Sequence, residues 1–290
     1  MSRNQIIFKY LVTDHVEMEL SVEIRQTEIS LSATDNITPP TSMSLIKSLK
    51  VPGNPVSVHS YDNKIYLGHN HSCDLLRYDL GLSDRVALLK GNSYVTSMQA
   101  YNNELYVWFA QEDLINVYDM TGKLKRSWEH SCLSKYFNKL RVVSDKVVVS
   151  SAQDQALTVY GLQGQLVKQI KCPAISKSDG YKAMAVCGDG SVVVSDCGSN
   201  SLFRVNIDSG EVMWTSKHVA RSQGVVCFEN RHVLVTSCNT DTRIWILDAN
   251  TGLCLFSNHN QLISYTCILL DDFSISFVLC CPGCCVWGDC

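Results

Sequence analysis

Five similar segments recur along this chain at intervals of 40 to 46 residues. In each segment an apolar strand runs into a tight turn and a second strand leaves it: LLRYDLGLSDRVALL, LINVYDMTGKLKRSW, LTVYGLQGQLVKQI, LFRVNIDSGEVMWT and RIWILDANTGLCLF. Tyr78 and Tyr118 are 40 residues apart, and the turn glycines follow at spacings of 42, 46 and 42 residues: Gly122, Gly164, Gly210 and Gly252. A period of about 40–45 residues built from short strands is typical of propeller blades, whereas helical repeats show an apolar period of about 3.6. The repeat therefore predicts an all-β propeller.

Two further strands precede every one of these turns, so each unit holds four strands, which we name A to D. Strands A and B are joined by polar hairpins in VSVHSYDNKIYLG, TSMQAYNNELYVWF, LRVVSDKVVVSS, AMAVCGDGSVVVSD and VVCFENRHVLVTSC. Their Asn, Asp and Gly centres tolerate the positive φ of tight hairpins, and Val, Ile and Tyr favour the flanking strands. The predicted blades span about 55–90, 95–130, 138–172, 181–217 and 223–258.

Strand B is the most apolar part of the unit. Runs such as KVVVSS and VSVVVSD are nearly continuous, as expected for a sheet covered on both faces by neighbouring blades. We therefore expect the core to lie between blades, with these side chains buried in it: Val148, Val149, Val193 and Val194. The cysteines keep the same register, since Cys187 and Cys227 occupy one point of strand A in successive units.

The two chain ends together predict a sixth blade. The segment MSLIKSLKV at 43–51 reads as a lone strand in the place of a D strand, and residues 264–280 supply an A and a B strand. Pairing the ends would hide strand edges that otherwise promote aggregation. The expected fold is a six-bladed β-propeller of four-stranded blades, whose composite last blade joins 264–290 to 44–50. Its strand C is weakly encoded, because only CVWGDC remains for it, so this blade could be incomplete. The side chains expected to meet there are Leu45, Ile46, Leu49, Ile275 and Phe277.

Residues 1–43 differ from the repeat. Apolar and polar residues alternate from Val16 to Arg25, which predicts an amphipathic strand. The stretch SATDNITPPTSMS then predicts a linker. Two strands do not make a stable domain alone. We therefore expect 1–43 to be a β-strand remnant of a larger upstream domain with a linker, and the propeller to occupy 44–290; pairing of the remnant onto the propeller is the alternative.

The composition excludes strong electrostatic attraction to nucleic acid or to an anionic membrane, because the net charge is only −3 from 25 basic and 28 acidic residues. Lys9 interrupts the apolar start of the chain, which makes it a poor secretory signal, and Asp271 and Asp272 interrupt the longest apolar run near the end. The cysteines before residue 280 occur singly, as buried thiols do in a reducing compartment. These observations predict a cytoplasmic protein without membrane association.

The strings DKVVVSSAQDQALTVYGLQGQLVKQI and GDGSVVVSDCGSNSLFRVNIDSGEV resemble NHL repeats, in which an apolar strand B is followed by a Gly/Asn-rich turn and an outer hairpin. The resemblance covers about residues 55–258 and is closest to the propellers that end tripartite-motif proteins; RIWILDANTGLCL also resembles a WD-repeat strand. In the NHL family the propeller recognises proteins or RNA and is commonly joined to a RING, a B-box and a coiled coil. No paired CxxC and His set precedes residue 44, so the resemblance does not imply ubiquitin-ligase activity.

Function is expected on the face where the D-to-A and B-to-C loops meet around the axial channel. The D-to-A loops KGNSY, EHSCLSKYFNK, KCPAISKSDGYK and KHVARSQG are basic and carry aromatic residues, whereas the B-to-C loops are neutral to acidic. Mixed charge with aromatic anchors suits a protein or peptide partner. The predicted partner-binding residues are Tyr94, Lys135, Tyr136, Lys139, Tyr181, Lys182, Arg221 and Gln223. The plainer interpretation is that the charged members are only solvated loop residues.

Two other classes of function are kept as alternatives. RNA binding needs a net basic face with stacking aromatics, and four loop carboxylates would oppose it: Asp113, Asp154, Asp179 and Asp241. An enzyme using the axial channel ranks third, because the sequence contains no nucleophile elbow, phosphate loop, metalloprotease helix or EF-hand spacing. The chain is therefore expected to be a non-enzymatic interaction module with no cofactor.

The C-terminal tail LCCPGCCVWGDC is rich in thiols. Cys281 and Cys284 have the CxxC spacing of a zinc-knuckle arm, but one short loop supplies four tetrahedral ligands poorly. We favour a tail without a selected role over a zinc site or palmitoylation. His69, His71 and Asp74 are a weaker metal candidate, since a third fixed ligand is missing.

Overall fold

The computed structural model describes seventeen stretches of the chain, and every regular element in them is a β-strand. The described residues are 3–12, 17–27, 47–52, 55–69, 74–79, 85–90, 93, 95–109, 112–130, 139–150, 155–173, 175, 182–228, 230–237, 243–259, 266–271 and 274–279.

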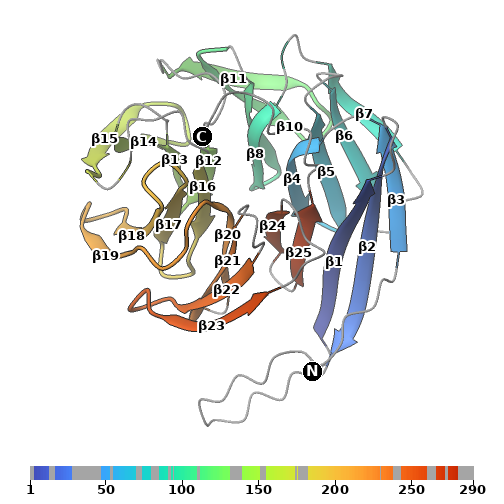
Figure 1. Cartoon of the computed structure of the whole chain (residues 1–290). Helices are drawn as coiled ribbons and strands as arrows, with labels where there is room; N and C mark the ends of the chain where they lie inside the picture. Colours follow the sequence, from blue (N-terminus) through green and yellow to red (C-terminus); the bar gives the residue numbers. More distant parts are fainter. Residues whose placement is uncertain are drawn as a thin grey trace.

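Five four-stranded antiparallel sheets stand around a central axis, and each contains four strands that follow one another in sequence (Figure 1). Blade I comprises β4 (Pro55–Tyr61), β5 (Lys64–His69), β6 (Asp74–Asp79) and β7 (Arg85–Lys90). Blade II comprises β8 (Val95–Tyr101), β9 (Glu104–Phe109), β10 (Leu114–Asp119) and β11 (Leu124–Glu129). Blade III comprises β12 (Lys139–Val143), β13 (Lys146–Ser150), β14 (Ala156–Gly161) and β15 (Leu166–Lys171). Blade IV comprises β16 (Lys182–Val186), β17 (Ser191–Asp196), β18 (Ser201–Asn206) and β19 (Val212–Ser216). Blade V comprises β20 (Ser222–Phe228), β21 (His232–Ser237), β22 (Arg243–Asp248) and β23 (Cys254–His259). The prediction of a propeller with four-stranded blades is confirmed.

The turn residues explain where the chain reverses. The A-to-B hairpins of blades I and II place two residues each at a φ between 49° and 58°: Asp62, Asn63, Asn102 and Asn103. Two consecutive residues with positive φ form a turn whose twist matches the flanking strands. The C-to-D turns use glycine instead. Gly164 has a φ of 88°, and a Cβ added to it would meet the ring of Trp128 at 2.6 Å, so both conformation and space require glycine there.

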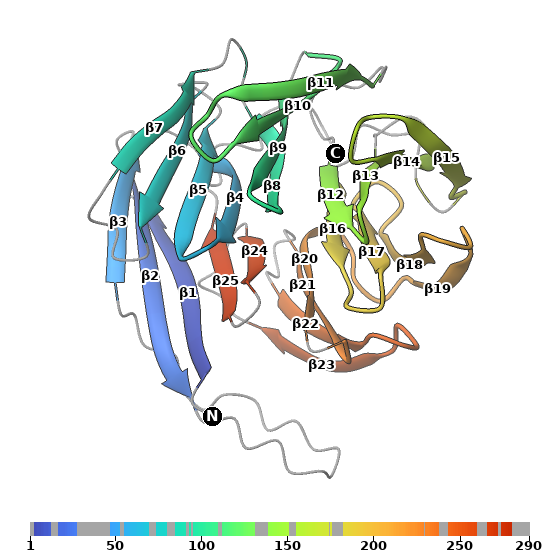
Figure 2. The same cartoon turned by 180° about the vertical axis from the view of Figure 1, so that it is seen from behind.

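The A strands form a closed inner ring. Each A strand contacts the next one around the axis, in the order β4, β8, β12, β16 and β20. β24 (Thr266–Asp271) lies between β20 and β4, and it pairs with β25 (Ser274–Leu279) in a two-stranded sheet. The C-terminal strands therefore close the ring between blades V and I (Figure 2).

The prediction of six four-stranded blades is wrong, because the described residues form five. β1 (Arg3–Val12), β2 (Glu17–Thr27) and β3 (Lys47–Pro52) form a separate antiparallel sheet in the order β1-β2-β3. β1 lies beside β25 in both views (Figures 1 and 2). The place beside the C-terminal strands that was expected for residues 44–50 is thus taken by β1, and β3 pairs with the other edge of β2.

Competition between strand edges explains this difference. β1 and β2 pair over ten residues each, so they form a long hairpin whose outer strand, β1, can lie beside β25. The shorter β3 then pairs with β2, where Leu49 is opposite Leu20. Pairing through β2 also joins the N-terminal strands to β3, which directly precedes blade I. Leu45 and Ile46, which were expected beside Ile275 and Phe277, lie outside the described residues.

The hydrophobic core lies between the blades, as expected. One cluster joins blades III and IV and includes Val148, Leu157, Met184, Val194 and Phe203. Another joins blades IV and V and includes Val193, Leu202, Val225, Val233 and Leu247. The four valines predicted to be buried on strand B are all 0% exposed. Both faces of an interior blade are therefore covered by its neighbours.

Arginine side chains fasten neighbouring blades at the C-to-D turns. In three blades a guanidinium donates to the backbone carbonyl of the equivalent turn residue in the next blade. The pairs are Arg77 Nη1 to Met120 O at 3.3 Å, Arg126 Nε to Leu162 O at 2.9 Å and Arg204 Nη1 to Ala249 O at 2.5 Å. A carbonyl held at a packed interface needs a donor, so these bonds help to set the spacing of the blades.

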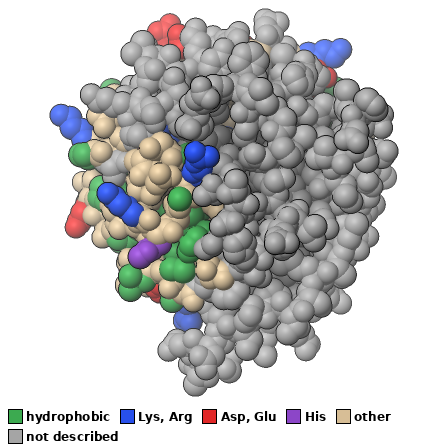
Figure 3. All heavy atoms as spheres, in the orientation of Figure 1, with side chains coloured by type: hydrophobic (Ala, Val, Ile, Leu, Met, Phe, Trp, Pro, Cys, Tyr) green, Lys and Arg blue, Asp and Glu red, His purple; other side chains and the backbone are tan. Residues whose placement is uncertain are grey.

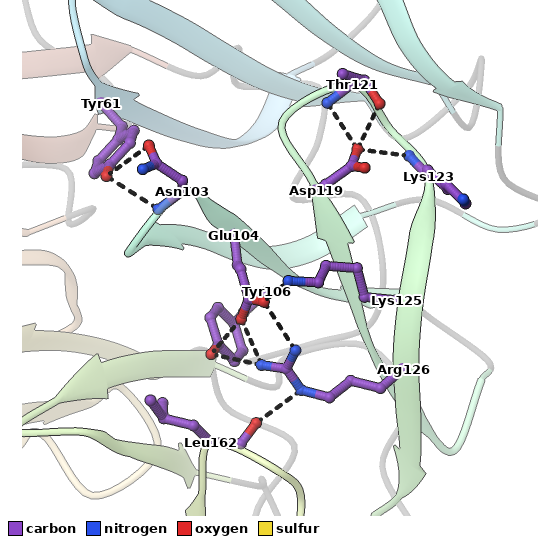
Figure 4. A network of polar contacts seen from close by, with 10 residues as sticks. All are labelled: Tyr61, Asn103, Glu104, Tyr106, Asp119, Thr121, Lys123, Lys125, Arg126 and Leu162. Carbon is purple, nitrogen blue, oxygen red and sulfur yellow. Dashed lines mark hydrogen bonds and ion pairs between the residues drawn. The ribbon is translucent and has the colours of Figure 1, made fainter.

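Glu104 of β9 organises the polar network shown in Figure 4. Its carboxylate accepts hydrogen bonds from Lys125 Nζ and from Arg126 Nη1 and Nη2, the last two at 3.0 and 2.5 Å. The hydroxyl of Tyr106 donates to the same carboxylate at 3.2 Å. The hydrogen bonds from Arg126 are the main reason that the pKa of Glu104 falls to about 2, and partial burial opposes them. Strands B and D of blade II are thereby linked across strand C.

Cys187 and Cys227 form a disulfide between blades IV and V, with their Cα atoms 5.3 Å apart. The expectation that these two cysteines are separate thiols is therefore wrong. By the A-to-B registers Cys187 corresponds to Phe228 and Cys227 to Val186, so the two cysteines are offset by one residue between the blades. Because successive side chains of a strand point to opposite faces, this offset lets the two thiols point toward each other across the blade interface.

Candidate functional site

The D-to-A and B-to-C loops lie at one end of the blades, which we name the loop face, and the A-to-B and C-to-D turns lie at the other, which we name the turn face. Antiparallel order within each blade imposes this division. The described parts of the loop face are loop 217–221, turn 197–200, residues 155, 171–173 and 175 of blade III, residues 112, 113 and 130 of blade II, and residue 93 between blades I and II.

Loop 217–221 connects β19 to β20, and its central residue is buried in the core. Val219 is 0% exposed, whereas Lys217, His218 and Arg221 are exposed. Arg221 has a φ of 49°, and its backbone N–H donates to Oδ1 of Asn200 at 2.8 Å. The loop is thus anchored in the core at one residue and tied to turn 197–200 at another.

Blade III repeats this arrangement. Gln155 and Asn200 are the last residues of their B-to-C connections, with φ values of 46° and 48°. Gln155 Nε2 donates to the carbonyl of Ile175 at 2.9 Å, and the carbonyl of Gln155 accepts from the N–H of Cys172 at 2.8 Å. Ile175 is 0% exposed. In both blades, a residue with an amide side chain and a left-handed backbone conformation therefore links the B-to-C connection to the following D-to-A loop by hydrogen bonds.

Two of the predicted partner-binding lysines lie inside the protein. Lys139 begins β12, is 8% exposed, and its Nζ donates to the carbonyl of Thr96 at 3.1 Å. Lys182 begins β16, is 0% exposed, and its Nζ lies 3.6 Å from Oδ1 of Asp196. The expectation that both belong to exposed loops is wrong, because the inner strands already begin at these residues. A buried ammonium group is costly to separate from its partner, which is a carbonyl for Lys139 and a carboxylate for Lys182, so both contacts support the fold.

The other predicted residues have different outcomes. Arg221 lies on the exposed loop face, as predicted. Gln223 lies in β20 at a shift in the pairing with β21, between Ser222 and Gly224. The remaining four lie outside the described residues, and their binding role stays a prediction: Tyr94, Lys135, Tyr136 and Tyr181.

Polar side chains of the A strands join blades II and III beneath the loop face. Gln99 Nε2 donates to the carbonyl of Val142 at 3.2 Å, and Gln99 Oε1 accepts from the N–H of the same residue at 2.9 Å. Ser97 Oγ accepts from the N–H of Leu140 at 3.0 Å. These residues could not be identified from the sequence, because a single Ser or Gln in a strand carries no signal until the register between blades is known.

The residue equivalent to Gln99 is His59 in blade I and Arg141 in blade III, as the A-to-B registers show. Burial, followed by the charge of Arg141, lowers the pKa of His59 to about 3, although a hydrogen bond with the backbone of Ala100 opposes this. Nε2 of His59 is buried and has no hydrogen-bond partner among the described residues. His59 is therefore neutral near pH 7, and among these three equivalent A-strand positions the positive charge is on Arg141 of blade III.

The exposed charges of the loop face divide by blade. Lys171, the last residue of β15, and Lys217, which follows β19, are both exposed. Glu129, the last residue of β11, holds the same place in blade II, where Asp113 is exposed too. Figure 3 shows Lys and Arg side chains among hydrophobic ones over β15 to β19. Among the described exposed residues of the loop face, blades III to V thus present cations, as blade I does with Lys90 at the end of β7, whereas blade II presents anions.

Metal and membrane features are limited to what the described stretches can show. Within them, no group of three or more His, Cys, Asp or Glu side chains could hold a metal ion. The same stretches contain no helix that could cross a lipid bilayer. His71 and the thiol-rich tail lie outside them, so the interpretations of these segments stay predictions.

Comparison with known proteins identifies the fold. No protein-family model matches the chain, and no curated protein sequence matches it. A chain in the crystal structure of a nidogen/laminin complex is 11% identical with a TM-score of 0.64, over 95% of this chain and 98% of that one. The WD40 β-propeller domain of Doa1 is 12% identical with a TM-score of 0.57, over 74% of this chain and 72% of that one. At such identities the likeness establishes a β-propeller and nothing more specific.

Proposed function

We propose that this chain is a non-enzymatic interaction module whose propeller binds a protein or peptide partner through the loop face. The observation that carries the proposal is loop 217–221, which presents Lys217, His218 and Arg221 from a backbone anchored by Val219 and Asn200. A loop that is already ordered loses little conformational entropy on binding. Arginine is also among the residues that dominate interface energies.

The comparisons support the same class of function. One propeller of similar fold was solved within a nidogen/laminin complex, which is an assembly of two proteins. Loops on a rigid scaffold are where binding residues are most often found, because they vary without disturbing the core. The closed inner ring and the interlocked blades of this chain provide such a scaffold.

The finer parts of the proposal rest on the sequence. They are the NHL-like character of the repeat, the similarity to tripartite-motif propellers and the cytoplasmic location. The location and the Cys187–Cys227 disulfide can be tested together by quenching cells in acid and alkylating free thiols under denaturing conditions, because cytosolic proteins keep such thiols reduced and both cysteines are buried in the folded protein. Modification of both cysteines supports a cytoplasmic protein, and protection of both contradicts it.

A photo-cross-linking experiment tests the binding face. The photoreactive residue p-benzoylphenylalanine replaces His218 on the loop face or, as the control, Lys123, which is exposed at the C-to-D turn of blade II. We expect protease-sensitive adducts in cell lysate from the His218 position and few from the Lys123 position. Equal adducts at both positions, or none at the His218 position, would contradict the proposal. Adducts removed by ribonuclease instead of protease would favour the RNA alternative.

A further inference from the structure

We propose that the loop face over blades III to V binds an acidic peptide segment, with Lys171, Lys217 and Arg221 as its charged contacts. This inference rests on the proposed function, and it adds the chemical class of the partner segment.

The three cations lie at one end of three neighbouring blades. Lys171 ends the outer strand of blade III, and Lys217 follows the outer strand of blade IV. Arg221 directly precedes β20, the inner strand of blade V. The positive charge therefore extends over the loop ends of three consecutive blades, from the outer strands of blades III and IV to the inner strand of blade V.

Many charges of the turn face are paired, although Arg85, Lys123 and Arg231 take part in no ion pair within the described stretches. The ion pairs there are Lys125–Glu104, Lys64–Asp79 at 3.0 Å, Arg126–Glu104 at 2.5 Å, Lys146–Asp208 at 2.9 Å and Arg204–Asp189 at 2.7 Å. Among the described residues, by contrast, none of Lys171, Lys217 and Arg221 takes part in an ion pair. Their neutralising charge has to come from solvent ions or from a ligand, and a carboxylate that replaces solvent ions gains by electrostatic complementarity.

The support beneath the cations is preorganised. Val219 and Ile175 anchor the two D-to-A loops in the core, and Asn200 and Gln155 tie each loop to the preceding B-to-C connection. A patch whose backbone is already fixed binds with a smaller entropic cost than a flexible one. Such a construction is expected of a binding surface more than of loops that are only solvated.

An acidic peptide fits this surface better than RNA does. Blade II, which is next to blade III, presents Glu129 and Asp113 at the same end, and these carboxylates would repel a longer polyanion. Single-stranded RNA is held largely by bases stacked on aromatic side chains. Among the described residues, none of the exposed large hydrophobic side chains is aromatic. The charge pattern therefore matches a short run of Asp or Glu.

Fluorescence anisotropy with two labelled probes tests the inference on the full chain. The probes are an oligoglutamate peptide and an oligouridylate of similar length and charge. The test variant is Lys217→Glu/Arg221→Glu, and the control is Arg85→Glu/Lys123→Glu, which makes the same charge change at exposed positions of the turn face. We expect the peptide Kd to rise about tenfold or more in the test variant and to stay within about twofold in the control. Added salt should weaken peptide binding as well.

Each other outcome overturns the inference. Absence of peptide binding to the wild-type chain does so, and so does an equal loss in the test and control variants. Tighter binding of the oligouridylate with the same dependence on Lys217 and Arg221 replaces the peptide by RNA. Protein adducts at position 218 without probe binding would retain the interaction module and remove only its preference for acidic segments. Matching thermal unfolding midpoints of the two variants confirm that folding is not the cause.

Discussion

Replacing His59 with glutamine should make the protein less sensitive to acid. Burial and the nearby charge of Arg141 lower the pKa of His59 from 6.5 to about 3 in the folded protein. Because the folded pKa is the lower one, the unfolded chain binds the proton first as the pH falls. The stabilisation by neutral His59 is therefore complete above about pH 6.5 and is lost progressively as the pH falls toward about 3.

The magnitude follows from these two values. A pH of 4.5 is about two units below the pKa of the His59 imidazole in the unfolded chain, so that imidazole is protonated. The imidazole in the folded protein is still neutral at this pH. Each pH unit below the unfolded pKa lowers the free energy of unfolding by about 1.4 kcal/mol, so His59 accounts for a loss of at most about 3 kcal/mol between pH 8 and pH 4.5. Glutamine does not titrate. Gln99 of blade II, which is equivalent to residue 59, forms hydrogen bonds with both the N–H and the carbonyl of Val142. A glutamine at position 59 would find the same two backbone groups on Ala100.

The assay is denaturant unfolding followed by tryptophan fluorescence, near pH 8 and near pH 4.5. Near pH 8, His59→Gln should lie within about 1 kcal/mol of the wild type, because it exchanges one hydrogen-bonded group for another. Near pH 4.5 it should be the more stable protein by about 2–3 kcal/mol. The reverse exchange, Gln99→His, should introduce acid sensitivity. An equal loss of stability on acidification in the wild type and His59→Gln would refute this reasoning.

Three further changes test the core, the polar network and the disulfide. Val193→Asp should lower the free energy of unfolding by several kcal/mol, since it places a carboxylate at a position that is 0% exposed; Val86→Asp, at a position 40% exposed, is the matched control, and similar melting temperatures would argue against the blade packing. Glu104→Gln should flatten the loss of stability between about pH 4.5 and pH 2, where the wild type protonates a carboxylate that Arg126 holds ionised; identical acid-unfolding curves would rule this out. Reduction of Cys187–Cys227 should cost up to about 4 kcal/mol for a closed loop of 40 residues, and Cys227→Ser should then show no response to reductant.

The blades could be predicted because their signals are local. Alternating or continuous apolar runs, hairpin centres such as Asn102-Asn103 and turn glycines such as Gly164 depend on the φ preferences and side-chain periodicity of adjacent residues. Five copies of the same pattern reinforce one another, so the four-stranded sheets could be placed without any knowledge of contacts. The burial of Val193 between blades follows from the same reasoning.

The candidate site was only partly predictable, since its loops lack a repeat. Arg221 was identified from the basic character of its loop, but Lys139 and Lys182 have the same character and are buried. One residue along the chain separates an exposed loop end from the start of an inner strand, and composition cannot locate that boundary. The amide contacts of Asn200 and Gln155 were missed because they link segments about 20 residues apart.

The repeat alone is sufficient to specify a propeller with four-stranded blades, because strand, turn and burial pattern are encoded within each unit. Which distant segments become partners depends instead on how the folded elements pack. β3 could pair with β25 or with β2 by its own pattern, and the position of β1 beside β25 selected β2. Cys187 and Cys227 likewise meet because neighbouring blades stack on one another. Such choices depend on differences of a few kcal/mol between competing contacts, and those differences exist only once the ring of blades has closed.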